Sequence, residues 1–89
     1  MSIAEELKKM DVWNKGHKIP DRDPNMWRRD DLGYEINYYE YGNRSSVYGW
    51  EFDHYPIPAS QGGSDEVYNL RPLYWAANAS LGNRGGLLG

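Results

Sequence analysis

Asp53 and His54 are adjacent at the end of a segment with strand character, and two amide residues, Asn69 and Asn78, follow them. The ordinary pKa of histidine, about 6.5, suits it to take a proton from water near neutral pH. Hard divalent cations prefer oxygen ligands, and the Asp53 carboxylate and the Asn78 side-chain carbonyl offer two. An activated water together with a cation that neutralises phosphate charge is what phosphodiester cleavage needs.

Neighbouring side chains of a strand point to opposite faces, so Asp53 and His54 can serve one site only if the strand bends or ends there. Pro56 and Pro58, just beyond, favour such an end. The second histidine, His17, has no carboxylate beside it in the sequence, and we expect it to be exposed and without function.

The segments around these residues predict an α+β fold. Apolar and aromatic residues alternate over 34–41, which indicates a half-buried strand, and a second extended segment runs over 47–52 into Asp53. A loop rich in turn formers covers 54–69. A returning strand follows over 70–73, where Pro72 confines it to an edge or a strand end. Residues 74–81 predict a helix that stops at Gly82.

The N-terminal third predicts two helices. Ser2 and Glu5 form a capping box for a helix over the first dozen residues, and Ile3, Leu7 and Met10 lie on one face, which we expect to pack on the core. Asp23–Pro24 favours a second helix to about residue 31, closed by Gly33. Its Arg28 and Arg29 beside two aspartates indicate a solvated face with local ion pairs, or one arginine that contacts phosphate.

We therefore expect one small domain: a helical segment over 1–33 that packs on a core over 34–84, and a flexible tail over 85–89. The chain has 89 residues, no cysteine and a net charge of −3, which excludes disulfide scaffolds and cysteine-ligated zinc fingers. No stretch approaches the ~20 apolar residues of a membrane span, and the acidic N-terminus is unlike a signal peptide, so we expect a cytoplasmic protein. Trp50 and Trp75 are expected to be core residues.

Most of the chain resembles the HNH endonucleases, and within them a group of small bacterial and phage proteins. The resemblance runs from about Val12 to Asn83. It is carried by YGNRSSVYGWEFDH over 41–54, PASQGGS over 58–64, NLRPL over 69–73 and Asn78, with VWNKG over 12–16 and DPN over 23–25 upstream.

This resemblance implies a ββα-metal fold, in which a hairpin and a helix hold one divalent ion, Mg²⁺ or Mn²⁺. It implies that His54 is the general base and that Asp53 and Asn78 are metal ligands. Asn69 would be the central asparagine that holds the loop and orients His54. Gly62 and Gly63 fit a tight turn within that loop.

The sequence departs from the family pattern in three ways: the first two reduce the substrate-facing chemistry without touching the ligands, and the third affects packing. Leu81 stands where many relatives carry a lysine, Ala76 and Ala77 occupy positions that are often polar, and Leu32 replaces a frequent cysteine. Two arginines, Arg71 and Arg44, are candidates for DNA contacts, with ion pairs to Glu51 or Asp65 as the alternative.

Two functions follow from these observations. The first is a metal-dependent HNH endonuclease that hydrolyses DNA, needs no nucleotide cofactor and no membrane, and acts alone or with a protein partner in a larger assembly. The second is a catalytically degenerate HNH fold that serves as a binding module, for example a phage protein that binds or inhibits a host nucleic-acid enzyme. The net negative charge gives no basic footprint for tight DNA binding and keeps the second function open.

Overall fold

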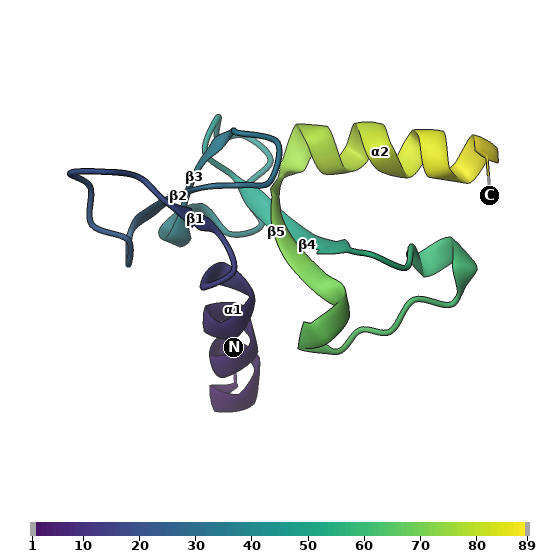
Figure 1. Ribbon diagram of the computed structural model, residues 1–89, viewed down its shortest axis with the longest axis horizontal. Helices are drawn as coiled ribbons and strands as arrows, with labels where there is room; N and C mark the ends of the chain where they lie inside the picture. Colours follow the sequence, from purple (N-terminus) through teal and green to yellow (C-terminus); the bar gives the residue numbers. More distant parts are fainter. Residues whose placement is uncertain (1, 89) are drawn as a thin grey trace.

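A computed structural model describes residues 2–88, with the side chains of residues 2–82. It forms a small α+β unit with two antiparallel sheets, ordered β1-β2-β3 and β4-β5 (Figure 1). The helices and strands are α1 (Ile3–Trp13), β1 (His17–Lys18), β2 (Trp27–Arg29), β3 (Glu35–Asn37), β4 (Trp50–His54), β5 (Leu70–Tyr74) and α2 (Trp75–Leu88). Within the described residues, no helix is long and apolar enough to cross a membrane.

Helix α1 has the predicted capping box but buries a different face. The Ser2 hydroxyl accepts from the Glu5 backbone N–H at 3.1 Å, and the Glu5 carboxylate accepts from the Ser2 N–H at 3.4 Å. The prediction for Ile3, Leu7 and Met10 is wrong, because these side chains are 81%, 56% and 45% exposed.

The opposite side of α1 docks instead, because it carries the large residues of the last turn. Val12 and Trp13 are buried, and the Trp13 ring lies 5.2 Å from that of Trp50 and 5.4 Å from that of Tyr38. The Tyr38 hydroxyl also donates to the Glu6 carboxylate at 2.5 Å. Aromatic contacts at the end of α1 therefore decide its orientation, against the polarity pattern of the helix.

The predicted second helix over 24–31 is wrong, since this segment forms one turn and then strand β2. Arg28 is buried and not on a solvated face: its guanidinium donates to the carbonyls of Pro24, Asn14 and Gly16 at 2.9–3.1 Å. These acceptors belong mainly to another segment, and they hold Arg28 in extended backbone opposite Ile36 of β3. The tertiary contacts override the local helix start signal.

Asp30 is buried too, and it connects the two sheets. Its Oδ1 accepts from the backbone N–H groups of Leu32 and Tyr34, and its Oδ2 accepts from the N–H of Tyr74 in β5 at 2.9 Å. A buried carboxylate is tolerated because these three donors satisfy it.

Strand β3 is shorter than the predicted strand over 34–41. Ile36 is fully buried, as the alternation indicates, but the chain then turns into a short 3-10 helix, η1 (Tyr38–Glu40). The Asn37 side chain caps η1 by accepting from the Tyr39 N–H at 2.9 Å, which ends the strand.

The hairpin of β4 and β5 agrees with the predicted second and third strands, although β4 begins only at Trp50. Its register places Asp53 opposite Arg71 and His54 opposite Leu70, and Pro72 lies in a two-stranded sheet where both strands are edges. Helix α2 follows β5 directly and packs on both strands of the hairpin. The predicted stop at Gly82 is wrong, because α2 continues to Leu88. Of the expected tail over 85–89, residues 85–88 belong to α2, and Gly89 lies outside the described residues.

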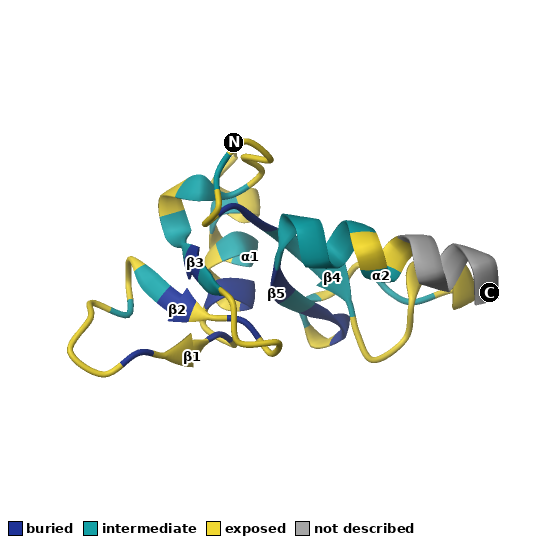
Figure 2. Ribbon diagram, turned by 90° about the horizontal axis from the view of Figure 1, so that it is seen from above, coloured by how far each residue is buried: buried dark blue, intermediate teal, exposed yellow. Residues whose placement is uncertain are grey.

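One core joins the N-terminal segment to the hairpin. Figure 2 shows the buried stretches along β5 and in β2 and β3, in the middle of the molecule. The core residues are Val12, Trp13, Ile36, Trp50 and Leu70. Trp50 is fully buried, as predicted, and Trp75 is half-buried with its indole N–H donated to the Ser46 carbonyl at 2.8 Å. The Lys15 ammonium also donates to the carbonyls of Val67 and Leu70, which ties the end of α1 to the start of β5.

Candidate active site

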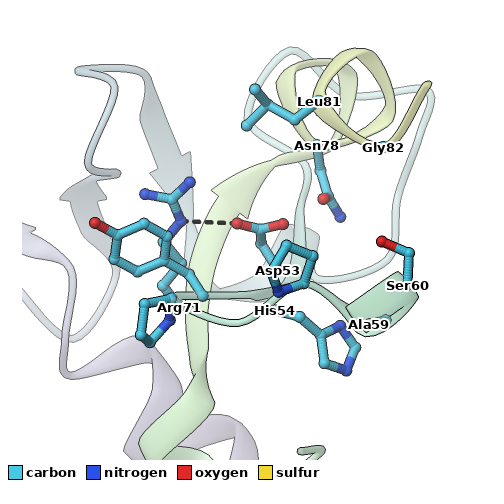
Figure 3. Close-up of a pocket in the computed structure, with 11 residues that line it drawn as sticks. Asp53, His54, Ala59, Ser60, Arg71, Asn78, Leu81 and Gly82 are labelled. Carbon is cyan, nitrogen blue, oxygen red and sulfur yellow. Dashed lines mark hydrogen bonds and ion pairs between the residues drawn. The ribbon is translucent and has the colours of Figure 1, made fainter. Parts of the chain in front are cut away.

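A cavity of about 440 Å³ lies where the end of β4, the following loop, β5 and α2 meet. Of the four residues predicted to act in catalysis or to hold the metal, Asp53, His54 and Asn78 line the cavity and Asn69 does not. Arg71 and Leu81 also contribute to its wall. Residues 53, 54, 71 and 78 come from three elements, so the hairpin followed by a helix is what brings them together (Figure 3).

Asp53 is bound to Arg71 across the hairpin. Its Oδ2 accepts from Arg71 Nε at 2.7 Å, and Arg71 Nη1 lies 3.3 Å from Asp31 Oδ2. Burial lowers the pKa of Arg71, but the two carboxylates outweigh it and raise that pKa overall. The alternative that Arg71 forms an ion pair is borne out, but its partners are neither Glu51 nor Asp65.

His54 is the last residue of β4, and its side chain lies on the other side of the strand from that of Asp53, as the alternation predicts (Figure 3). Both nevertheless line the same cavity, because the strand ends there. The His54 Nε2 lies 2.6 Å from Asp65 Oδ1, and this hydrogen bond holds the pKa of the exposed Asp65 below its usual value.

Sequence reasoning missed Asp65 as the partner of His54. The one available signal was an acidic residue in a loop that must return to β5, whose first residue Leu70 pairs with His54. Glu66, the neighbouring acidic residue of the same loop, matched that description equally well, so the signal was not specific.

Asn69 is buried and holds the loop in shape. Its amide nitrogen donates to the carbonyls of Ile57 and Ser64 at 2.9 and 3.0 Å, and its Oδ1 accepts from the Ile57 N–H at 3.0 Å. These side-chain hydrogen bonds go to the backbone of the loop, and none goes to His54. The backbone carbonyl of Asn69 also accepts from the backbone N–H of Tyr55, the residue after His54, at 3.0 Å. Any effect on His54 therefore passes through the backbone.

The two loop glycines are required by shape, as predicted. Gly62 has φ +81°, in the left-handed region. A Cβ on Gly63 would lie 1.9 Å from the Ile57 carbonyl oxygen and 2.8 Å from the Asn69 amide nitrogen.

Asn78 reaches the cavity from α2 and is oriented by β4. Its Nδ2 donates to Glu51 Oε1 at 3.3 Å and to the Phe52 carbonyl at 3.4 Å. Both bonds use the nitrogen, so the carbonyl oxygen Oδ1 is the atom left to meet a cation. Glu51 is also held by Arg44, at 2.7 and 2.9 Å, so the ion-pair alternative for Arg44 is borne out.

The oxygen donors around the cavity fit a hard divalent cation. Within residues 2–82, no group of three or more His, Cys, Asp or Glu side chains could hold a metal. An ion would therefore rest on the Asp53 carboxylate, the Asn78 carbonyl and water, which is the chemistry that Mg²⁺ accepts. The surroundings of the cavity carry an excess of negative charge. Two guanidinium groups, of Arg44 and Arg71, face four carboxylates at or beside the cavity, of Asp31, Glu51, Asp53 and Asp65.

His17 is exposed, as expected, but it has a carboxylate partner. Its Nε2 lies 2.7 Å from Asp31 Oδ1, while the other oxygen of Asp31 faces Arg71. This contact lies outside the cavity wall and does not bring His17 into the site.

No protein-family model matches the chain, and neither the curated proteins nor the solved structures contain a significant match to it.

Proposed function

We propose that the protein is a metal-dependent endonuclease of the HNH type that hydrolyses phosphodiester bonds in DNA. The observation that supports it best is the shared cavity of Asp53, His54 and Asn78, with the loop between them held by Asn69. The order β4, β5, α2 is the order of elements in a ββα-metal motif.

In this proposal His54 is the general base. Asp65 accepts from Nε2, so the ring nitrogen left to take a proton from water is Nδ1. The water oxygen then attacks phosphorus, its proton goes to Nδ1, and the bond from phosphorus to the leaving sugar oxygen breaks. A divalent ion at the Asp53 and Asn78 oxygens would neutralise charge on the phosphate and on the leaving oxygen.

Two features of the cavity favour the binding-module alternative, and the first is the hydrogen bond from Arg71 to Asp53. The Arg71 guanidinium takes one carboxylate oxygen at 2.7 Å and places a positive charge where a cation would be held. Leu81 adds an apolar side chain to the same wall. A protein that kept the scaffold for binding alone would tolerate both features.

Plasmid cleavage separates the two functions. Purified protein is incubated with supercoiled plasmid and Mg²⁺ or Mn²⁺, beside a His54→Ala variant and a His17→Ala control. His17 is the matched control because it is also a histidine bonded to an aspartate, but it is exposed and lies outside the cavity.

Nicking by the wild type and by His17→Ala, lost in His54→Ala, is the expected result. Removal of a general base costs about 10²–10⁴-fold in rate. Cleavage that survives in His54→Ala, or that is absent with every divalent ion, would overturn the proposal.

A further inference from the structure

Tyr55 directly follows His54 and presents an aromatic ring at the same cavity. The residue is 51% exposed, and the Arg71 guanidinium carbon lies 4.0 Å from the ring centroid, so one ring face is backed by a cation. Half of the residue stays exposed although Arg71 covers one ring face, so aromatic surface remains at the cavity for a flat partner. A base stacked there would add to the cation–π contact already present.

The charged residues of the chain provide little electrostatic attraction for a DNA duplex. Most duplex affinity comes from cations that neutralise phosphates. Here the net charge is −3, and arginines 22, 44 and 71 each pair with a carboxylate while Arg28 is buried on carbonyls. Stacking does not depend on net charge, but it needs a base whose face is exposed, which a paired and stacked duplex does not offer.

A second aromatic hollow adjoins the first. Its volume is about 240 Å³, it shares Leu81 with the main cavity, and it is lined by Tyr34 and Tyr74, whose rings lie 5.0 Å apart. Tyr34 is itself exposed. Two aromatic positions on either side of Leu81 suit a flexible strand with successive unpaired bases.

From these observations we infer, on the basis of the proposed nuclease function, that the substrate is single-stranded or locally unpaired DNA. Tyr55, backed by Arg71, stacks on a base next to the phosphate at His54 and thereby selects unpaired strands. Tyr55 takes no part in proton transfer or in holding the cation; it is a specificity residue.

Binding is measured by fluorescence anisotropy with a labelled oligonucleotide, single-stranded or annealed to its complement, in the His54→Ala background so that nothing is cut. The single strand is expected to bind more tightly. Tyr55→Ala is expected to weaken single-strand binding by about five- to a hundredfold and Tyr55→Phe only slightly, because stacking on an aromatic is worth about 1–3 kcal/mol per base. The control is Tyr39→Ala, an equally aromatic residue that is 74% exposed and lies outside both hollows.

An abasic position in the strand distinguishes stacking from a merely structural role of Tyr55. Moved along the strand, the abasic site should weaken binding by the wild type at the position that stacks on Tyr55, and at that position it should add no further loss in Tyr55→Ala. The loss should also persist at high salt, because stacking is not screened.

The outcomes separate this inference from the nuclease proposal. Duplex bound as tightly as the single strand, equal binding by Tyr55→Ala, or no binding of either overturns the inference, whatever the plasmid assay shows. If binding depends on Tyr55 but the protein cleaves no DNA with any divalent ion, the nuclease proposal is overturned and the single-strand selectivity is kept.

Discussion

Arg71 lies directly opposite Asp53 in the β4–β5 register, and its Nε donates to Asp53 Oδ2 at 2.7 Å. The same carboxylate is the strongest oxygen ligand that the cavity offers to a cation. A metal ion bound at the proposed site would therefore compete with Arg71 for Asp53, whereas Arg71 would attract a phosphate of the proposed substrate. Replacing Arg71 should therefore change the affinity for the metal and the affinity for DNA in opposite directions.

Arg71→Ala is expected to raise the affinity for Mg²⁺ or Mn²⁺, because it frees Asp53, and to weaken DNA binding. The salt slope of DNA binding should fall by about one unit, as for the loss of one phosphate contact. Isothermal titration calorimetry measures the affinity for the metal, and anisotropy titrations at several salt concentrations measure the affinity for DNA. Arg22→Ala, which removes an arginine paired with Glu35 away from the cavity, should change neither. A lower metal affinity in Arg71→Ala would refute the competition.

Metal binding should raise the melting temperature of the wild type and not that of Asn78→Ala. An ion that binds only the folded state at ten times its Kd adds about 1.4 kcal/mol, which for a domain of this size is a rise of roughly 6–11 °C. Chelation should reverse the rise. Asn25→Ala, a change of an exposed asparagine outside the cavity, should keep the full response. An equal rise in Asn78→Ala would remove Asn78 from the ligand set.

Gly63→Ala and Gly82→Ala are expected to change stability in opposite directions. A Cβ at Gly63 would collide with the Ile57 carbonyl and the Asn69 amide, so the loop must shift and lose hydrogen bonds, at a cost of about 2–3 kcal/mol. A Cβ at Gly82 meets nothing within 4 Å, and alanine in a helix interior stabilises by about 0.5–1 kcal/mol. Urea unfolding measures both. A neutral Gly63→Ala would show that the loop is not held as described.

Stability should fall in alkali through Tyr38. Burial and the Glu6 carboxylate raise the pKa of Tyr38 well above its usual range. The folded state thus disfavours tyrosinate, and the stability that this provides is present below the unfolded pKa of about 10 and is lost as the pH rises above it. The unfolding free energy, measured by urea titration from about pH 9 to about pH 11, should fall by at most about 1.4 kcal/mol per pH unit for one such group.

Tyr38→Phe should flatten this pH dependence, and Tyr39→Phe, at an exposed position, should not. Burial also raises the pKa of Tyr41, so part of the slope should remain in Tyr38→Phe. An unchanged slope in Tyr38→Phe would show that another group causes the alkaline loss.

Local patterns predict this fold well where the interacting residues are close in sequence. The Ser2–Glu5 cap, the strand that ends at His54 and the strand after Asn69 depend on neighbours or on turn residues nearby. The cavity at Asp53, His54 and Asn78 follows, because a hairpin and the next helix pack together.

Other features depend on contacts between distant segments, which no local pattern contains. Arg28 is drawn into extended backbone by the carbonyls of Asn14 and Gly16, and the last turn of α1 docks through Trp13 on Trp50. The first contact overrides a local helix start signal, and the second decides which face of α1 is buried, against the apolar pattern of that helix. The pairing of His54 with Asp65 spans the whole loop and is equally nonlocal.

The tie from Lys15 to the carbonyls of Val67 and Leu70 joins residues more than fifty positions apart, at the point where the site loop ends. Because Trp13 and Leu70 also share one core, neither the N-terminal helix nor the hairpin can complete its burial without the other. The molecule should accordingly unfold in a single cooperative step, with the most protected amide protons of α1 and of β5 giving the same free energy of opening in hydrogen exchange. A shortened chain that lacks α1 would lose the ordered loop between β4 and β5 along with the helix.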